Sequence, residues 1–592
     1  MNRLRNLEDW FDERTGWRGW RRALIDRPLA GDAPWSSALG MSVATCFAVL
    51  VVTGLVLMTV YAPSPQSAWA SVHYTQHVLA GGWIVRGLHS WAAQALMVLA
   101  ALHVAFGAVA GSYRKPREIA WWLGLLVVGL AVGGGITGGL LPWDQRGWWA
   151  RVVEGNIVGL APVLGGWLQQ MMIGGTELGA LGLARAHAIH VVVLPLTMAV
   201  VLWARHKLVQ RHGWGETVVL GATQLQRLAR DAVVAALVVV ALSAFTWMTH
   251  GAYLDAPADP MSNYPARPEW FLLTLFELRK FFHGAGEFWG TTLVPGAGAL
   301  YLALLPWLDT PSRPRAVVMA PVVLIFGAAV GLGAFAWRND ARDGQFARQH
   351  AKADARAMAA VKLAMDGIPP AGALEMVRRD PELRGRDLFD QHCASCHVLG
   401  DLGDPKKATA TKLDGWGTSD WIAAMIHEPD APEFFGRTPY VGEMPSVDTR
   451  PKNKPPPERW TPMVKSDAEK RAVAGFLASQ GDEPGDPSRA MDEATRSMGE
   501  KIVSERCTTC HLFKGEGDDE GNGLAPELSR YGSQAWTRAQ VANPASPQTY
   551  RDEALDEKRK KHMPRFDTDL SAADIDLVAR WTRAHARALP LP

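Results

Sequence analysis

Two histidines in one uncharged stretch are the first residues of this sequence that could do chemistry. The range 87–113 contains no Lys, Arg, Asp or Glu, and His89 and His103 are its two imidazoles. Fourteen helical residues turn a side chain to within about 40° of its starting direction and rise roughly 21 Å. Both imidazoles therefore lie on one helix face, near opposite sides of a bilayer. Neutral imidazole is a good iron ligand, so we expect each to hold one of two stacked haems; the alternative is a pair of buried histidines bonded to neighbouring helices.

Four of the five cysteines fall in two short units, Cys393-Ala-Ser-Cys396-His397 and Cys507-Thr-Thr-Cys510-His511. This pattern is typical of covalent haem c attachment, in which both thiols form thioethers and the histidine ligates the iron. A methionine that ligates the iron on the face of the haem opposite the histidine raises the reduction potential of the haem. We expect Met563 in the second unit and Met444 in the first, with Met463 as the alternative. A zinc ribbon would need further paired ligands, and the sequence has none beside these units.

The sequence that must position these residues changes near residue 337, from long apolar runs to a polar and charged composition. Before that point seven uncharged runs are each long enough to cross a bilayer as a helix: about 36–62, 87–113, 119–143, 186–204, 232–254, 288–308 and 316–337. Beyond it the chain is polar and charged. The net charge of +2 argues against a nucleic-acid partner.

The charges of the connecting loops predict an orientation. The loop 62–85 has no Lys or Arg, whereas the N-terminus and the loops 111–118, 205–230 and 311–315 are basic. The positive-inside rule places the basic loops and the N-terminus in the cytoplasm of a bacterial cell. Seven crossings of the inner membrane then leave everything after Trp337 in the periplasm. The first forty residues are basic and Trp-rich, so we expect no cleavable signal peptide.

The fourth span supplies a second histidine pair, His190 and His206. With this pair the region 5–337 resembles cytochrome b of quinol:cytochrome c reductases. Arg86 lies three residues before His89 and Arg185 five before His190, as in that family. The resemblance implies two non-covalent haems b, each between two histidines, with both arginines neutralising propionates of the outer haem.

Glycines and one irregular spacing bear on this resemblance. Gly40 and Gly54 are fourteen residues apart, as are Gly124 and Gly138. Because glycine has no side chain, each pair lets a flat ligand approach the helix backbone closely at the depth of each histidine. His190 and His206 are sixteen residues apart, whereas the family uses fourteen or fifteen. We expect His206 to be the inner ligand, with a kink at Pro195 or a one-residue π-bulge absorbing part of the excess.

Two further motifs resemble the quinol-oxidation site of the family. One is Leu141-Pro-Trp-Asp-Gln-Arg-Gly, which closes the third span, and the other is Pro268-Glu269-Trp270-Phe271, where relatives have Tyr at the last position. Oxidation of a quinol releases two protons, so a carboxylate beside the hydroxyl is useful. The resemblance implies that Glu269 is this carboxylate; the alternative is a surface-loop glutamate.

The sequence therefore predicts an all-α protein, a seven-span transmembrane bundle followed by two small helical cytochrome c modules. The expected divisions are an interfacial segment 1–35, a four-helix haem-binding core 36–230, a three-helix part 231–337, an exposed helical linker 338–380, and modules 381–482 and 491–592, which repeat after about 114 residues.

The resemblance implies a proton-translocating quinol:cytochrome c oxidoreductase subunit. Its implied partners are a Rieske iron–sulfur protein, membrane quinol and quinone, and a periplasmic electron acceptor or terminal oxidase, within a dimeric complex. The alternative is a quinol dehydrogenase subunit that feeds another periplasmic reductase without a Rieske partner. A purely structural membrane anchor would not need six candidate haem-ligand histidines.

Overall fold

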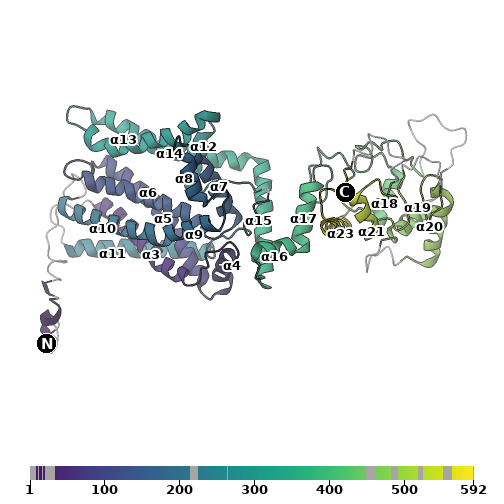
Figure 1. The fold of residues 1–592 in the computed structure, drawn as a ribbon, viewed down its shortest axis with the longest axis horizontal. Coiled ribbons are helices and arrows are strands. Elements are labelled where there is room, and N and C mark those ends of the chain that lie inside the picture. The colour runs from purple at the N-terminus through teal and green to yellow at the C-terminus, as the bar shows by residue number, and fades with distance from the viewer. Residues whose placement is uncertain are drawn as a thin grey trace. The chain divides into compact units, whose positions relative to one another are not determined.

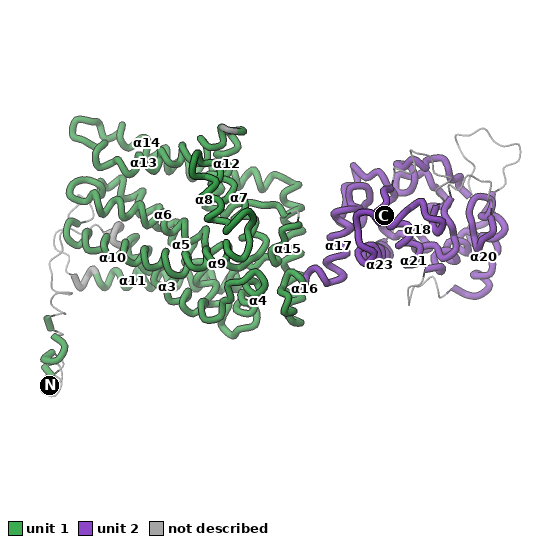
Figure 2. Tube along the Cα trace, viewed as in Figure 1, with its two compact units in different colours: residues 1–376 green, residues 377–592 purple. Residues whose placement is uncertain are grey.

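Helices joined by turns and loops make up the part of the chain that the structure describes, apart from three isolated β-bridges. The computed structural model describes residues 9–10, 12–16, 18–19, 34–213, 224–262, 264–447, 462–481, 491–517, 525–550 and 563–590. Most of the predicted interfacial segment 1–35 lies outside these residues. The chain divides into two compact units, Met1–Met376 and Val377–Pro592 (Figure 2). The predicted all-α class is confirmed.

Seven helices of the first unit, among the described residues, are long and apolar enough to cross a membrane, as predicted. They are α3 (Pro34–Met58), α5 (Gly82–Val109), α6 (Glu118–Leu140), the continuous run of α9 (Ala180–Ala188), η2 (Ile189–Val193) and α10 (Leu194–His212), α11 (Gln224–Met248), η5 (Trp289–Leu293) with α13 (Val294–Leu308), and α14 (Arg315–Arg342) (Figure 1). Lipid offers no hydrogen-bond partners, so these apolar segments satisfy their own backbone as helices. Their outer faces leave large side chains exposed, such as Leu237 and Val240, which is the surface a bilayer would cover.

Four of the spans form the bundle that positions the histidines. α5 packs against α3 on one side and α6 on the other, and α6 packs against α10. α11 covers α3 and α5 from outside. The core between them is built mainly from small and aliphatic side chains, such as Ala92, Ala100 and Val127, which let the helices approach closely.

Short helices cover one end of this bundle. α7 (Gln145–Gly159) and α8 (Gly165–Ile173) follow α6, and η3 (Trp270–Leu272) and α12 (Leu273–Arg279) precede α13. α7 begins where the side chain of Asp144 accepts a hydrogen bond from the backbone N–H of Gly147 at 2.8 Å. On the same side lie α4 (Ala68–His73) and η1 (Tyr74–Val78). These connections carry both motifs of the expected quinol-oxidation site.

The predicted linker is less exposed than expected. Its helix α15 (Gly344–Ala364) buries Ala357, Ala360 and Ala364, which share one helix face. The helix is fixed to the loops of the first unit by side chains: Tyr253 donates to Asp354 at 2.8 Å, and His73 Nε2 lies 3.2 Å from the carbonyl oxygen of Val361. This part of 338–380 therefore belongs to the first unit, which extends to Met376.

The second unit contains helices of both predicted modules in one hydrophobic core. They are α17 (Pro381–His392), α18 (Ser419–His427), α19 (Asp467–Ala478), α20 (Glu493–Arg506), η7 (Cys507–Thr509), α21 (Gln534–Ala542) and α23 (Ala572–Ala588). Each α-helix of this set begins at a Ser, Thr or Asp whose side chain accepts a backbone N–H bond.

The first helix of each module packs on the last helix of the other module. α17 lies on α23, and α20 lies on α19. Glycines make both crossings close: a Cβ on Gly385 would lie 2.5 Å from Cβ of Trp581, and one on Gly499 would lie 2.7 Å from Cβ of Phe476. The two modules are therefore exchanged at their first helices and share one core.

Candidate functional site

The histidines at one end of the bundle face each other across its interior. His89 comes from α5 and His190 from η2, and their ring centroids are 6.2 Å apart. Each ring lies over a glycine of a neighbouring span. A Cβ on Gly54 would be 3.2 Å from Cε1 of His89, and one on Gly138 would be 2.7 Å from Cε1 of His190. We call this the outer end of the bundle, and the end that contains His103 the inner end.

Two threonines orient these rings, and sequence reasoning missed them. The hydroxyls of Thr53 and Thr137 donate to carbonyl oxygens of their own helices, at 2.6 and 2.7 Å. Each hydroxyl has one proton, so it accepts from Nδ1–H of His89 at 2.9 Å and of His190 at 3.0 Å. This leaves the lone pair on Nε2 of both rings. The signal in the sequence is a Thr-Gly dipeptide in both spans.

The outer end fits a metal bound between two imidazoles. A ligating nitrogen lies about 2 Å from its metal, so two rings on opposite sides of one metal have centroids roughly 6 Å apart. The observed 6.2 Å agrees. The second nitrogen of a ligating histidine normally donates to an oxygen, as it does here to both threonines. Glycines at 54 and 138 leave room for a flat group beside the rings.

The arginines beside the outer pair bond to backbone oxygens. Arg86 donates to Ala252 O at 2.6 Å and Tyr253 O at 2.7 Å, and also to Gln76 Oε1 at 2.9 Å. Arg185 Nη1 donates to Met171 O at 3.3 Å. Both arginines lie on the segments that hold His89 and His190. Their predicted contact with haem propionates stays a prediction.

The inner end has a different arrangement. His103 is buried, and a Cβ on Gly40 would lie 3.5 Å from its Cε1. The second imidazole was expected beside Gly124. Arg205 lies there instead, and its Nε would be 3.3 Å from a Cβ on Gly124. Arg205 Nη2 donates to His103 Nε2 at 2.7 Å. The structure does not bring His206 to His103: its ring is exposed and lies 2.9 Å from Nε2 of Gln210.

An ion pair joins the two motifs of the expected quinol site. Arg146, in the motif after the third span, donates from Nη2 to Oε2 of Glu269 at 2.8 Å. The carboxylate is mostly buried, with 15% of its side chain exposed. Trp270 donates to the side-chain oxygen of Gln94 on α5. Phe271 packs onto α6, where a Cβ on Gly135 would lie 2.9 Å from its ring.

Phe271 ties this motif to the outer histidines. Gly135 is three residues, about one helical turn, before Gly138, which lies against His190. The motif Pro268-Glu269-Trp270-Phe271 thus lies beside the outer end rather than in a separate surface loop.

A second buried carboxyl near this motif was not predicted. Glu154 of α7 lies 3.8 Å from Arg151, and both side chains are less than a tenth exposed. Burial raises the pKa of Glu154 to about 7, while Arg151 lowers it and Glu269 raises it further. A group with this pKa exchanges protons near neutral pH. Nothing in the spacing of this helix distinguishes Glu154 from a surface residue, so sequence reasoning could not find it.

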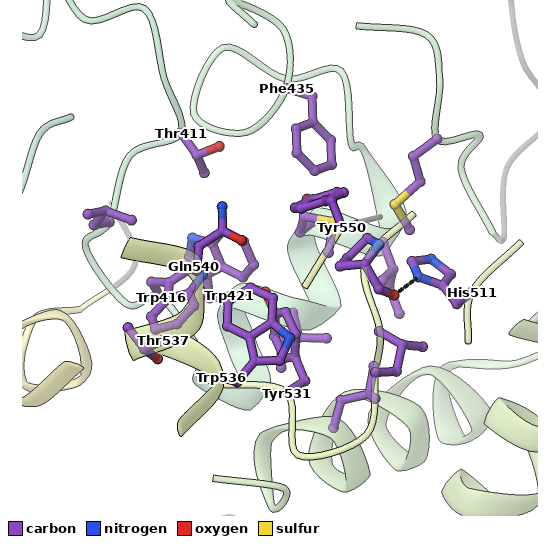
Figure 3. A pocket seen from close by; sticks show the side chains of 18 of the residues that line it. Thr411, Trp416, Trp421, Phe435, His511, Tyr531, Trp536, Thr537, Gln540 and Tyr550 are labelled. Carbon is purple, nitrogen blue, oxygen red and sulfur yellow. Dashed lines mark hydrogen bonds between the residues drawn. The ribbon is translucent and has the colours of Figure 1, made fainter. Parts of the chain in front are cut away.

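The two Cys-x-x-Cys-His units line one cavity of about 250 Å³ in the second unit (Figure 3). His397 Nδ1 donates to Thr411 O at 2.8 Å, and His511 Nδ1 donates to Pro526 O at 2.9 Å, which places the lone pair of each ring on Nε2, the atom that would ligate a metal. All three candidate methionines, Met444, Met463 and Met563, also line the cavity. Gln540 Nε2 lies 3.3 Å from the sulfur of Met563.

Aromatic rings from both modules form the walls of this cavity. Trp416 and Trp536 line it with ring centroids 6.1 Å apart, and Tyr550, which also lines it, stacks on Tyr440 with centroids 6.0 Å apart. The lining is otherwise mostly aliphatic and thioether side chains. This donor set, with two thiols and one imidazole per unit, fits one covalently bound haem at each unit, beside an apolar lining that both modules share.

Comparisons with known proteins matched both parts of the chain to cytochrome families. The family description Cytochrome b/b6/petB matches residues 25–213, and Cytochrome c matches residues 383–481 and 497–585. Cytochrome b6 of Emiliania huxleyi is 31% identical over 210 residues, which make up 36% of this chain and 98% of that protein. Cytochrome b6 of Stigeoclonium helveticum is 32% identical with the same coverage. A solved structure described as "Hyperthermophilic respiratory Complex III" aligns with a TM-score of 0.48 at 23% identity, covering 55% of this chain and 90% of that chain.

The seven spans and the cytochrome matches define a multi-pass membrane haem protein of electron transport. Because its relatives are matched over nearly their whole length, this chain belongs to the cytochrome b/b6 family, and two cytochrome c domains follow. The family resemblance drawn from the sequence is confirmed. Family membership implies b haems in the bundle and covalent haem c in the second unit.

Proposed function

We propose that this chain is the cytochrome b/c subunit of a quinol-oxidising oxidoreductase, and that quinol binds beside Glu269 at the outer end of the bundle. The observation that carries the proposal is the 2.8 Å ion pair between Glu269 and Arg146. It joins the two motifs that the family uses at its quinol-oxidation site. Phe271 adds a contact with α6 one turn from the glycine beside His190.

The residues that would hold the haems follow from the fit described above. His89 and His190 ligate an outer haem b, Thr53 and Thr137 fix their rings, and Arg86 and Arg185 neutralise its propionates. Cys393, Cys396 and His397 hold one haem c, and Cys507, Cys510 and His511 hold the other. Met444 and Met563 are the proposed sixth ligands. When bound, these haems supply one-electron transfer between the quinol site and acceptors in the periplasm and across the membrane.

Protons are handled by the chain's own carboxylates. Quinol oxidation releases two electrons and two protons, and Glu269 accepts one proton when its carboxylate turns from Arg146 to the quinol hydroxyl. Glu154, whose pKa of about 7 suits proton exchange at neutral pH, is the next acceptor. Trp270 and Phe271 would provide the apolar side chains of the proposed quinol site.

The proposed partners follow the family. A Rieske iron–sulfur protein takes the first electron, and a periplasmic acceptor or a terminal oxidase takes electrons from the haem c modules, within a dimeric complex that translocates protons. Pro268-Glu269-Trp270-Phe271 favours this over a Rieske-independent quinol dehydrogenase, because the motif belongs to the bifurcating family.

Contacts of α15 support the proposed orientation. The helix follows the seventh span, and it bonds to His73 in the loop between the first two spans and to Tyr253 after the fifth. These loops would then share one side of the membrane with the second unit, as expected for a cytoplasmic N-terminus and periplasmic haem c modules in the bacterial inner membrane.

The test is quinol-driven reduction of the c haems in the purified complex with its partners, followed at the c-type absorption band. We expect Glu269→Gln to slow it about 100-fold. Glu287→Gln is the matched control, because Glu287 also pairs with an arginine, Arg279 at 2.8 Å, outside the two motifs. Equal rates for wild type and Glu269→Gln would contradict the proposal.

A further inference from the structure

The inner end of the bundle departs from the outer end in the register of one helix. His89 and His103 are fourteen residues apart on α5, and so are the glycines that face each level. On the fourth span the corresponding residue must therefore lie fourteen helical positions beyond His190. The span is not a regular helix, because η2 (Ile189–Val193) is a π-helical turn that starts one residue before His190.

A π-helical turn accommodates one residue more than an α-helical one. Arg205 is fifteen residues beyond His190 and His206 is sixteen. After the extra residue is subtracted, Arg205 lies fourteen positions from His190 and His206 fifteen. Arg205 therefore has the same helical register as His103 on α5, and His206 is turned about 100° further around the helix.

The contacts agree with this register. Arg205 crosses Gly124 as His190 crosses Gly138, and it donates both to His103 Nε2 at 2.7 Å and to Ala120 O at 3.2 Å. At the outer end Nε2 of each histidine is left with its lone pair for a metal. At the inner end the lone pair of His103 Nε2 is instead used by the guanidinium.

The position of His206 supports the same conclusion. Its ring is exposed on the face of α10 that is turned away from the core of the bundle. It is hydrogen-bonded to Gln210, one turn further along the same helix. To face His103 it would have to exchange places with Arg205, which needs a rotation of the helix by one residue. That rotation would also move Val201 and Met198 out of the core of the bundle.

We propose that the inner end does not hold a haem between two histidines, and that Arg205 occupies the place of the second ligand. The chain then carries one bis-histidine haem b, at His89 and His190. His103 is instead hydrogen-bonded to the guanidinium group of Arg205. The donor set at this end, one imidazole and one guanidinium, does not fit the low-spin site that the family implies. This inference rests on the proposed haem-binding role of the bundle.

The test counts low-spin b-type haem in the purified complex with its partners, by pyridine haemochrome analysis and by EPR of the oxidised protein. We expect one low-spin haem b for every two haems c. The substitution His206→Gln should leave both readouts unchanged. Arg205→His should add one low-spin haem b, because it places an imidazole opposite His103 in the correct register.

The outcomes separate this inference from the proposed function. Two low-spin haems b in the wild type, or loss of one in His206→Gln, would overturn the inference and leave the proposed function intact. A complex without any haem b would overturn both. Should Arg205→His fail to fold, the wild-type count and the His206→Gln variant still decide the question.

Discussion

The two ends of the haem-binding bundle share a plan but differ in three details. At both ends a histidine of α5 lies against a glycine of α3, and a residue of the fourth span lies against a glycine of α6. At the outer end that residue is His190, and threonines hold both rings. At the inner end it is Arg205, bonded directly to His103. The glycines also leave more room there: on α3 the distance is 3.5 Å beside His103 against 3.2 Å beside His89, and on α6 it is 3.3 Å beside Arg205 against 2.7 Å beside His190.

This difference shows that a glycine pair does not by itself define a haem site. Glycines provide the space, and the ligand comes from the register of the facing helix. The π-helical turn at Ile189–Val193 sets that register for the inner end. The proposed quinol chemistry lies at the end where the ligand set is complete.

Removal of one outer ligand should have the largest effect. We expect His190→Gln to lose all low-spin haem b and to reduce quinol-driven reduction of the c haems to the background rate. The control is His187→Gln, one turn earlier, where the ring stacks on Tyr61 at 5.3 Å instead of facing His89. Retention of low-spin haem b in His190→Gln, measured by EPR, would remove the distinction between the two ends.

The second expected effect is on proton transfer beside the outer end. Arg146→Gln removes the ion pair that positions Glu269. We expect turnover to fall about tenfold while the b-type spectrum stays that of wild type, because no haem ligand changes. The readout is the steady-state rate as a function of pH together with the optical spectrum. A changed b-type spectrum would mean that Arg146 supports the haem site rather than Glu269.

Alanine at Gly138 and at Gly40 tests how much room each end leaves beside its histidine. A methyl group on Gly138 would lie 2.7 Å from Cε1 of His190, so Gly138→Ala should displace the ring and lower haem b content by about half or more. A methyl group on Gly40 would lie 3.5 Å from His103, an ordinary contact, so Gly40→Ala should retain wild-type haem content. The measurement is the ratio of haem b to haem c. Equal losses in both variants would show that the two ends are equivalent.

The smallest expected effect is a pH-dependent change in stability at Glu154. Burial raises the pKa of this group to about 7 from an unfolded value of 4.5, so the folded state binds the proton more tightly. Its contribution to stability is full below pH 4.5 and is lost as the pH rises through about 7. Relative to wild type, Glu154→Gln should therefore gain thermal stability between pH 5 and pH 8. A difference in melting temperature that does not change with pH would contradict the raised pKa.

Much of the fold could be predicted because each span is a long apolar run with a clear charge boundary. The two Cys-x-x-Cys-His units and the outer histidine pair were also visible, since their chemistry depends on short or regular spacings. The exchange of α17 and α20 between the modules could not be predicted. The pattern of an amphipathic helix shows which face is buried but not which other helix packs against that face.

The remaining features depend on register and on partners distant in sequence. Thr53 and Thr137 look like ordinary hydroxyl residues of apolar helices until the opposite histidine is known. The spacing of sixteen between His190 and His206 predicted a π-bulge or a kink, and the structure has the π-helical turn at Ile189–Val193. The spacing did not show that this turn brings Arg205, one residue before His206, opposite His103. The segment 338–380 was predicted to be an exposed helical linker, because its sequence does not show that Ala357, Ala360 and Ala364 of α15 are buried.

A potentiometric titration of the b-type absorption band in the purified complex tests the asymmetry between the two ends most directly. The account predicts a single one-electron component, which disappears in His190→Gln and is unchanged in His206→Gln. Two components in the wild type, of which one disappears in His206→Gln, would contradict it.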